Sequence, residues 1–243
     1  MPNAKLNVIY NNEDILVIDK PPGVIVFPEG SPLSGKKQVK EKTLIDYLLE
    51  EFPNLKKTGK DPRYGIVHRL DKDTSGIILV AKNNKSLEFL QKQFKERKVI
   101  KKYVALVVGN PKKDKGVIET LIGRAPKDRR KQKVYLFNDP DAQGKRKAVT
   151  EYKVLKNFRN YALMEVVLKT GRKHQIRCHL GYLGHPIAED KLYGFKNQLC
   201  PNGLNRHFLH ASYLKIELPG GGMREIKSEL PDNLKKILKD LKT

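Results

Sequence analysis

The sequence lacks the features that would place it among disulfide-rich, zinc-binding or membrane-spanning proteins. Its two cysteines, Cys178 and Cys200, have no close paired spacing, so we interpret both as reduced packing residues rather than as a disulfide framework or zinc site. No apolar run approaches the roughly 20 residues of a transmembrane helix, and the N-terminus has no signal-peptide pattern. These absences predict a soluble cytoplasmic protein without a membrane partner.

Several common catalytic motifs are also missing. There is no phosphate-binding GxxxxGK[ST] loop, GxGxxG turn, HExxH helix or GxSxG elbow. Nucleotide-driven, flavin-dependent and zinc-protease chemistries therefore lose their usual signatures. The 243 residues contain no internal repeat, low-complexity tract or linker, so a single domain over residues 1–243 is predicted. A monomer is the default expectation.

What the sequence has in excess is positive charge. Lysine and arginine number 49 against 27 acidic residues, which gives a formal net charge of +22. A soluble protein of this size does not need such an excess for solubility, so we expect an anionic polymer as partner. Charge alone does not separate an enzyme acting on nucleic acid from a passive binder.

Strand and helix patterns alternate along the chain without a repeating βαβ unit. Strands are predicted at residues 8–10, 15–18, 24–27, 77–80, 101–108, 149–155, 162–168 and 207–218. Helices are predicted at 43–52, 83–94 and 173–183 and from 232 onward. A polar loop is predicted at residues 28–42, and a basic hairpin with a turn at 138–141 is predicted at about 123–148. The pattern favours a mixed α+β fold.

Asp71 stands in a turn-like segment before an apolar strand and has three interpretations. Asp, Thr, Ser and Gly are ordinary turn residues. The spacing of Asp71, Asp73 and Ser75 also matches half of a calcium loop, but Lys82 occupies the position that requires a bidentate glutamate. Third, an ionised carboxylate kept beside a cation can act as a nucleophile or a base.

Two further segments contain candidate functional residues. Ile176, Leu180 and Leu183 follow helical spacing, so His174 and Arg177 share another face and could point together into a cleft; alternatively, Arg177 pairs with a surface acid or packs its stem. Tyr103 stands in a strand, where tyrosine usually packs. Its basic neighbours keep open a role as a ring on which a base stacks.

Taken together, these segments resemble the RluA/RluD-type pseudouridine synthase family. The resemblance rests on the runs 68–76 and 168–179 and on Lys102-Tyr103. Supporting segments, in the order typical of the family, are 18–23, His185-Pro186 with Asp190, Tyr193-Gly194 and 209–211. The resemblance implies a mixed, mainly antiparallel central sheet with flanking helices and an RNA-binding cleft. Many relatives have a small RNA-binding domain before the catalytic part; here the first strand begins almost at once, so we expect that domain to be absent and the basic hairpin to capture RNA.

The resemblance also implies individual roles. Asp71 would be the catalytic aspartate, Arg177 would form the ion pair that orients it, and Tyr103 would stack on the target base. Arg69 would enter the space left by the flipped nucleotide. Together with the basic hairpin, the matching segments extend the predicted substrate-binding set to His68, Thr74, Arg172, His174, Arg129, Arg130 and Lys131.

The implied reaction isomerises uridine to pseudouridine in structured RNA, either ribosomal or transfer RNA. It breaks the bond between ribose and uracil nitrogen, turns the base and rejoins it through carbon, so it needs no redox or energy cofactor and no metal. It does require the base outside its stack. The alternatives are a non-catalytic RNA-binding protein acting in ribosome assembly or as an RNA chaperone, and a metal-dependent nuclease using Asp71 and Asp73.

Overall fold

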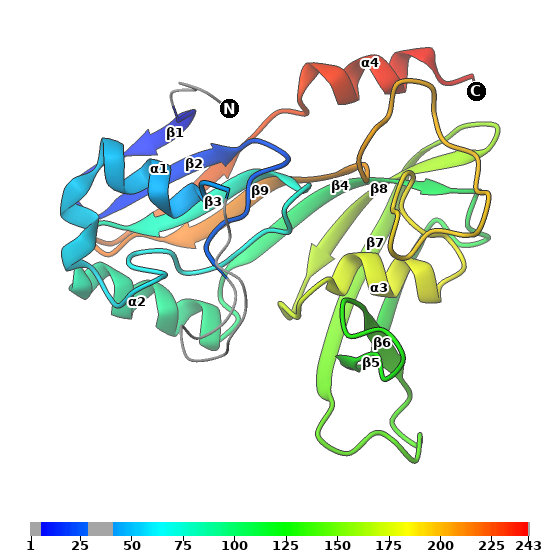
Figure 1. Cartoon of the computed structure of the whole chain (residues 1–243), viewed down its shortest axis with the longest axis horizontal. Coiled ribbons are helices and arrows are strands. Elements are labelled where there is room, and N and C mark those ends of the chain that lie inside the picture. The colour runs from blue at the N-terminus through cyan, green and yellow to red at the C-terminus, as the bar shows by residue number, and fades with distance from the viewer. Residues whose placement is uncertain (1–5, 29–40, 243) are drawn as a thin grey trace. The chain divides into compact units, whose positions relative to one another are not determined.

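The computed structural model describes residues 6–28 and 41–242, which form two compact units. Unit 1 consists of Met1–Val99 and Leu214–Ser228, and unit 2 of Ile100–Tyr213 and Glu229–Thr243. Figure 1 shows the elements of each. Most of the polar loop predicted at 28–42 lies outside the described residues.

Unit 1 is built on a strand set that begins at the N-terminal part of the chain. Its strands are β1 (Val8–Asn11), β2 (Ile15–Lys20), β3 (Ser75–Ala81), the second part of β9 (Leu209–Glu217) and β10 (Met223–Lys227). They pair in the order β1-β2-β3-β9-β10, and the β1–β2 and β2–β3 pairs are antiparallel. All seven residues of β3 are buried, as expected for a continuous apolar strand covered on both faces.

The helices of unit 1 begin where the sequence supplies N-caps. Thr43 and Asp46 form a capping box at the start of α1 (Leu44–Glu51), and the Asn83 side chain accepts a hydrogen bond from Ser86 N at the start of α2 (Asn84–Lys95). A short 3-10 helix, η2 (Pro53–Lys57), follows α1. The buried face of α2 packs on the β2 and β3 side chains in one apolar cluster.

The strand predicted at residues 24–27 is wrong. Val24, Val26 and Phe27 are buried, which accounts for the apolar pattern, but the segment pairs with no strand among the described residues. Its carbonyl groups accept other donors: Ile25 O and Val26 O accept from the backbone N–H groups of Leu44 and Ile45 at 2.7 and 3.1 Å. The segment thus satisfies the open N-terminus of α1 instead of a sheet edge.

Unit 2 contains a second, antiparallel strand set. Its strands are β4 (Ile100–Val108), β5 (Lys115–Arg124), β6 (Gln132–Tyr135), β7 (Arg146–Asn157), β8 (Tyr161–Leu168) and the first part of β9. They pair in the order β9-β4-β8-β7-β5-β6, and the β4–β8, β8–β7, β7–β5 and β5–β6 pairs are all antiparallel. The β5 residues before Gly123 were not predicted as a strand.

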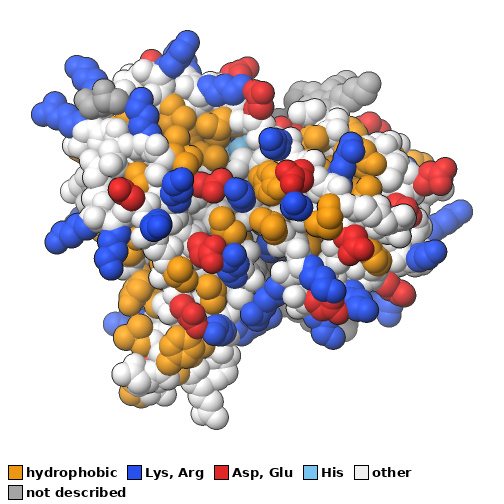
Figure 2. All heavy atoms as spheres, turned by 180° about the vertical axis from the view of Figure 1, so that it is seen from behind, with side chains coloured by type: hydrophobic (Ala, Val, Ile, Leu, Met, Phe, Trp, Pro, Cys, Tyr) orange, Lys and Arg blue, Asp and Glu red, His pale blue; other side chains and the backbone are white. Residues whose placement is uncertain are grey.

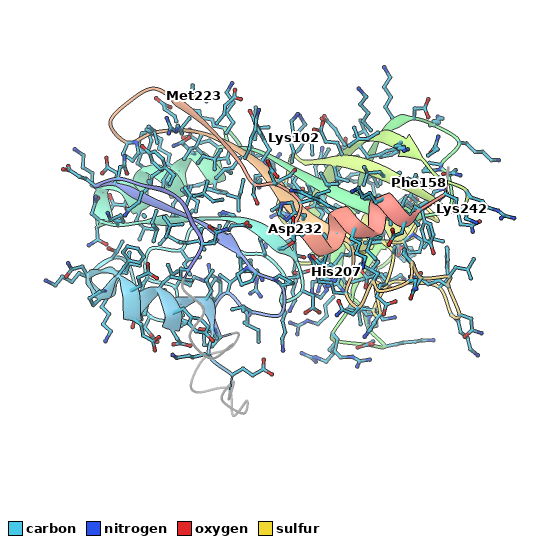
Figure 3. All side chains as sticks on the ribbon, turned by 90° about the horizontal axis from the view of Figure 1, so that it is seen from above. Lys102, Phe158, His207, Met223, Asp232 and Lys242 are labelled. Carbon is cyan, nitrogen blue, oxygen red and sulfur yellow. The ribbon has the colours of Figure 1, made fainter. Side chains whose placement is uncertain are left out.

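Two helices complete unit 2. Helix α3 (Gln175–Tyr182) lies beside β6 and β7, as Figure 1 shows. It begins two residues later than predicted because His174 has a left-handed backbone with φ of 54°. Helix α4 (Asp232–Asp240) buries Leu234 and Ile237, and Lys242 just beyond it accepts a hydrogen bond at its carbonyl from Arg159 N; Figure 3 shows this end of the chain beside Phe158.

The predicted mixed α+β class with mainly antiparallel strands is confirmed, because every strand pair with a described register is antiparallel and helices are interspersed among the strands. Within the residues described, no helix has the length and apolar character that crossing a membrane requires.

Candidate active site

Asp71 occupies a tight turn at the entrance to β3 in unit 1. Thr74 N donates to Asp71 O at 3.1 Å, which closes the turn, and the Thr74 side chain is buried. Leu70 before the turn and Ser75 after it are also buried. The partly exposed Asp71 is therefore presented on a short segment that is anchored at both ends.

A buried lysine stabilises the same turn from the neighbouring strand β2. Lys20 Nζ donates to the carbonyls of Pro21, Val24 and Lys72 at 2.7, 2.9 and 2.9 Å. Gly23 N also donates to Lys72 O, and its φ of 84° is one that glycine adopts readily. The residue next to Asp71 is thus fixed by a fully buried ammonium group and a backbone amide.

The side chains of His68 and Arg69 pack against aromatic rings of unit 1. His68 Nε2 accepts from Leu79 N at 3.0 Å, and its ring stacks on Phe94 at 5.2 Å between centroids. The Arg69 guanidinium lies 5.1 Å from the centre of the Phe27 ring. These contacts give both side chains a packing role, and their contact with RNA stays a prediction.

Tyr103 belongs to β4 in unit 2 and is only 6% exposed. Lys101, two residues earlier, lies on the same side of the strand, and burial lowers the pKa of its ammonium group to about 8. A Cβ added at Gly171 would lie 3.6 Å from Lys101 Nζ. Lys101 was not predicted as a functional residue, although it stands beside Tyr103 and the loop before α3.

Arg177 projects from α3 into a buried ion pair with Asp190. Its Nε donates to Asp190 Oδ2 at 2.7 Å and its Nη2 to Oδ1 at 2.9 Å, so the pair is bidentate. Burial disfavours the charged carboxylate, but the hydrogen bonds and charge of Arg177, with His207, hold the pKa of Asp190 below its ordinary value. Arg177 does pair with an acid, as one interpretation of the sequence held, but that acid is buried rather than on the surface.

Gln175 fixes the start of α3 against β7. Its Nε2 donates to Val149 O at 3.0 Å and Thr150 Oγ1 at 2.9 Å, while its Oε1 accepts from Thr170 Oγ1 at 2.8 Å and Arg172 N at 2.9 Å. The buried amide thus has all four hydrogen-bonding positions in use. Sequence reasoning placed Gln175 in a family segment without giving it a role; two of its partners, Val149 and Thr150, belong to the separate strand β7.

Arg172 and His174, which were also predicted as site residues, contact different partners. Arg172 Nε donates to Lys147 O of β7 at 2.9 Å. His174 Nδ1 and the Tyr193 hydroxyl are 3.0 Å apart, and the Arg177 guanidinium lies 5.2 Å from the centre of the same Tyr193 ring. His174 and Arg177 therefore both contact Tyr193, which sequence reasoning left without a role, and that they point together into a cleft stays a prediction.

The predicted basic hairpin consists of two connected parts. Strands β5 and β6 enclose a turn at residues 125–131, and a second loop at 136–145 leads to β7. Arg129 and Arg130 are exposed and Lys131 is half-buried, but Arg130 is paired with Asp128 through Nη2 to Oδ2 at 2.8 Å. In Figure 2, blue basic side chains lie among red acidic ones over the visible face, so on that face positive charge is not gathered in one patch.

Two further questions from the sequence are the role of the cysteines and whether acidic residues gather at a metal site. Cys178 and Cys200 are free thiols. Burial raises the pKa of the Cys178 thiol to about 12, which fits a packing residue, whereas Cys200 is exposed and the packing interpretation is wrong for it. Across the described parts of the chain, no three His, Cys, Asp or Glu side chains gather in a group that fits a metal ion.

Comparisons by sequence and by fold both relate the chain to known proteins of one class. Residues 14–182 match the family described as RNA pseudouridylate synthase. The solved structure of human RNA pseudouridylate synthase domain containing 1 has a TM-score of 0.75 and 27% identity, covering 95% of this chain and 86% of that one.

Relatives by sequence lead to the same class. An uncharacterized RNA pseudouridine synthase of Aquifex aeolicus is 44% identical over 204 residues, which is 83% of this chain and 60% of that protein. A Borreliella burgdorferi protein named ribosomal large subunit pseudouridine synthase D is 37% identical over 94% of this chain and 66% of its own length. This chain belongs to the RNA pseudouridylate synthase family. It spans 60% of the length of the Aquifex relative.

Proposed function

We propose that this chain isomerises selected uridines of structured RNA to pseudouridine, with Asp71 as the catalytic residue and without a cofactor. The observation that carries the proposal is the Asp71 turn: it lies inside the family match over residues 14–182 and is held by Lys20 and Gly23 through the backbone of Lys72. A protein that only binds a polyanion would gain nothing from a carboxylate at this position.

The chemistry explains why a positioned carboxylate is needed. The N1–C1′ bond of the uridine breaks, the uracil turns, and a C5–C1′ bond forms; the hydrogen on C5 leaves as a proton and N1 gains one. No electron is transferred between molecules. The base must first leave its stack, which costs a few kcal/mol, and an ionised carboxylate at the sugar can then act as nucleophile or base.

We further propose that Arg177 and Tyr103 act with Asp71, as the family resemblance implies: Arg177 as its ion-pair partner and Tyr103 as the ring on which the target base stacks. Arg69, His68, Thr74, Arg172 and His174 complete the substrate-binding set. The names of several relatives, such as the Borreliella burgdorferi protein, refer to the ribosomal large subunit, so ribosomal RNA is the substrate to test first and transfer RNA the second.

The test is tritium release from RNA labelled at carbon 5 of uracil, with EDTA present and no cofactor. Wild type should release tritium from at least one transcript in a panel of ribosomal fragments and transfer RNAs. Asp71→Asn should abolish release while leaving RNA affinity almost unchanged. Asp73→Asn is the matched control, because it removes a carboxylate from the same turn, and it should retain release.

Three other outcomes would contradict the proposed function or the role of Asp71. Tight RNA binding without release by wild type would favour the non-catalytic RNA-binding protein. In a parallel assay with magnesium in place of EDTA, strand cleavage by wild type would favour the nuclease. Wild-type release by Asp71→Asn would remove Asp71 from the catalytic role.

A further inference from the structure

The ion pair of Arg177 and Asp190 in unit 2 is buried and is supported by further hydrogen bonds. The side chain of Asp190 is 0% exposed and that of Arg177 10% exposed. Asp190 Oδ1 also accepts from the backbone N–H groups of Leu192 and Tyr193 at 3.0 and 3.1 Å. The carboxylate is therefore fixed by its own turn before it receives the arginine, and it is anionic at neutral pH because its pKa lies below the ordinary value under the influence of Arg177.

Tyr193 supports the guanidinium on a second side. Its ring centre lies 5.2 Å from Arg177 Cζ, and the His174 ring meets it edge-on at 5.8 Å. The Tyr193 hydroxyl accepts from Gln132 N at 2.7 Å and lies 3.0 Å from His174 Nδ1. The hydroxyl contacts keep the ring from swinging away from Arg177, so the ring stays beside the guanidinium.

These interactions also connect Arg177 with the base of the basic hairpin. Gln132 is the first residue of β6, and its carbonyl is 3.5 Å from Cys178 Sγ, next to Arg177 in α3. The backbone of Gln132 is thus held on one side by Tyr193 and on the other by α3. The segment that bears Arg129, Arg130 and Lys131 ends at this point.

We propose that Asp190 and Tyr193 are positioning residues for Arg177: Asp190 fixes the location of the guanidinium, and Tyr193 fixes its plane and ties it to β6. The proposal rests on the proposed function, in which Arg177 acts in catalysis. The bonds to Asp190 use Nε–H and one Nη2–H of the five N–H donors of the guanidinium, so this side-on pairing sets the direction in which the other edge of the fork points.

The first experiment measures single-turnover tritium release at saturating RNA, together with RNA affinity. Asp190→Asn should slow the chemical step about a hundredfold, the loss that a misplacement of about 1 Å can cause, with RNA affinity little changed. Tyr193→Phe should also slow it, because the ring stays but the hydrogen bonds of the hydroxyl disappear. Asp232→Asn and Tyr182→Phe, which alter exposed side chains of the same unit, should match wild type.

If Asp190 acts only through Arg177, its effect on the rate should disappear when Arg177 is removed. In an Arg177→Ala background, Asp190→Asn should cause no additional loss of rate, because the group that it positions is gone. Independent, multiplying losses would show a merely structural role, and a wild-type rate for Asp190→Asn alone would also overturn the proposal.

The second experiment needs no enzymatic activity. It compares two variants with wild type, so it does not rest on the stability of one variant. The Arg177 Nε–H signal in nitrogen-15 NMR, assigned by its loss in Arg177→Lys, should exchange slowly with water in wild type and faster in Asp190→Asn and Tyr193→Phe. Equal exchange in all three proteins would overturn the positioning role. If wild type releases no tritium from any RNA, the proposed function fails, while this measurement still decides how Arg177 is held.

Discussion

The two units fix their candidate catalytic side chains by different means. In unit 1, Asp71 stands on a turn that is held through main-chain carbonyls by Lys20 and the Gly23 amide. In unit 2, Arg177 stands on a helix and is held side chain to side chain by Asp190 and Tyr193. The position of Asp71 therefore depends on the path of the backbone, whereas that of Arg177 depends on the identity of a few buried polar residues.

The largest effect on stability should come from the lysine that holds the Asp71 turn. Lys20→Met keeps the length of the side chain but removes a buried donor from three carbonyls, so we expect a loss of about 3 kcal/mol in the free energy of unfolding. Tritium release should fall as well, since the turn at Asp71 loosens. Urea unfolding measures the first effect. Lys85→Met, on the exposed face of α2, is the control and should change stability by less than about 0.5 kcal/mol.

The same variant tests whether support through the backbone is specific to unit 1. If it is, hydrogen exchange in Lys20→Met should increase in β2 and β3 and stay unchanged in α3. Equal increases in both units would contradict the comparison.

A somewhat smaller effect is expected from acid on the buried polar residues of unit 2. His179 is buried between Thr150 Oγ1 at 2.8 Å from Nδ1 and Thr120 Oγ1 at 3.0 Å from Nε2, and burial lowers the pKa of its ring to about 4. The unfolded chain, with a pKa near 6.5, binds the proton first, so the stability present above pH 6.5 is lost as the pH falls toward 4.

From this pKa difference, about 2 kcal/mol of unfolding free energy should be lost between pH 7.5 and pH 5. Urea unfolding at both values measures the loss in wild type. His179→Gln cannot take up this proton and should lose less over the same interval. Identical pH dependence in the two proteins would show that His179 does not contribute.

The smallest effect on the fold should come from the hairpin, where charge is exposed. Replacing Arg129, Arg130 and Lys131 with glutamine should leave stability within about 0.5 kcal/mol. It should flatten the salt dependence of RNA binding by about one unit of log–log slope for each phosphate that is no longer bound. Because Arg130 is already paired with Asp128, Arg130→Gln alone should change the slope least.

The matched control removes the same charge elsewhere in unit 2: Lys236, Lys239 and Lys242, which are exposed in and after α4, become glutamine. An equal change of slope in both triple variants would assign RNA binding to net charge rather than to the hairpin.

Local patterns predicted most of the elements because their causes are local. The apolar run of β3, the capping box of α1 and the Asn83 cap of α2 are readable in neighbouring residues. Residues 24–27 were misassigned since an apolar run shows burial but not the partner of its carbonyls. The start of α3 was placed too early because the left-handed backbone of His174 is coupled to contacts with Tyr193, 19 residues away.

Consecutive residues were enough to establish the fold class, the family and the segments in which Asp71, Tyr103 and Arg177 stand, because strand and helix periodicity and family motifs are properties of short stretches of chain. The support of the Asp71 turn by Lys20, and of Arg177 by Asp190 and Tyr193, became visible in the folded molecule alone. Burial creates these relations: a polar group removed from water must find its partners wherever the fold brings them, and one partner of Lys20 is Lys72, 52 residues away.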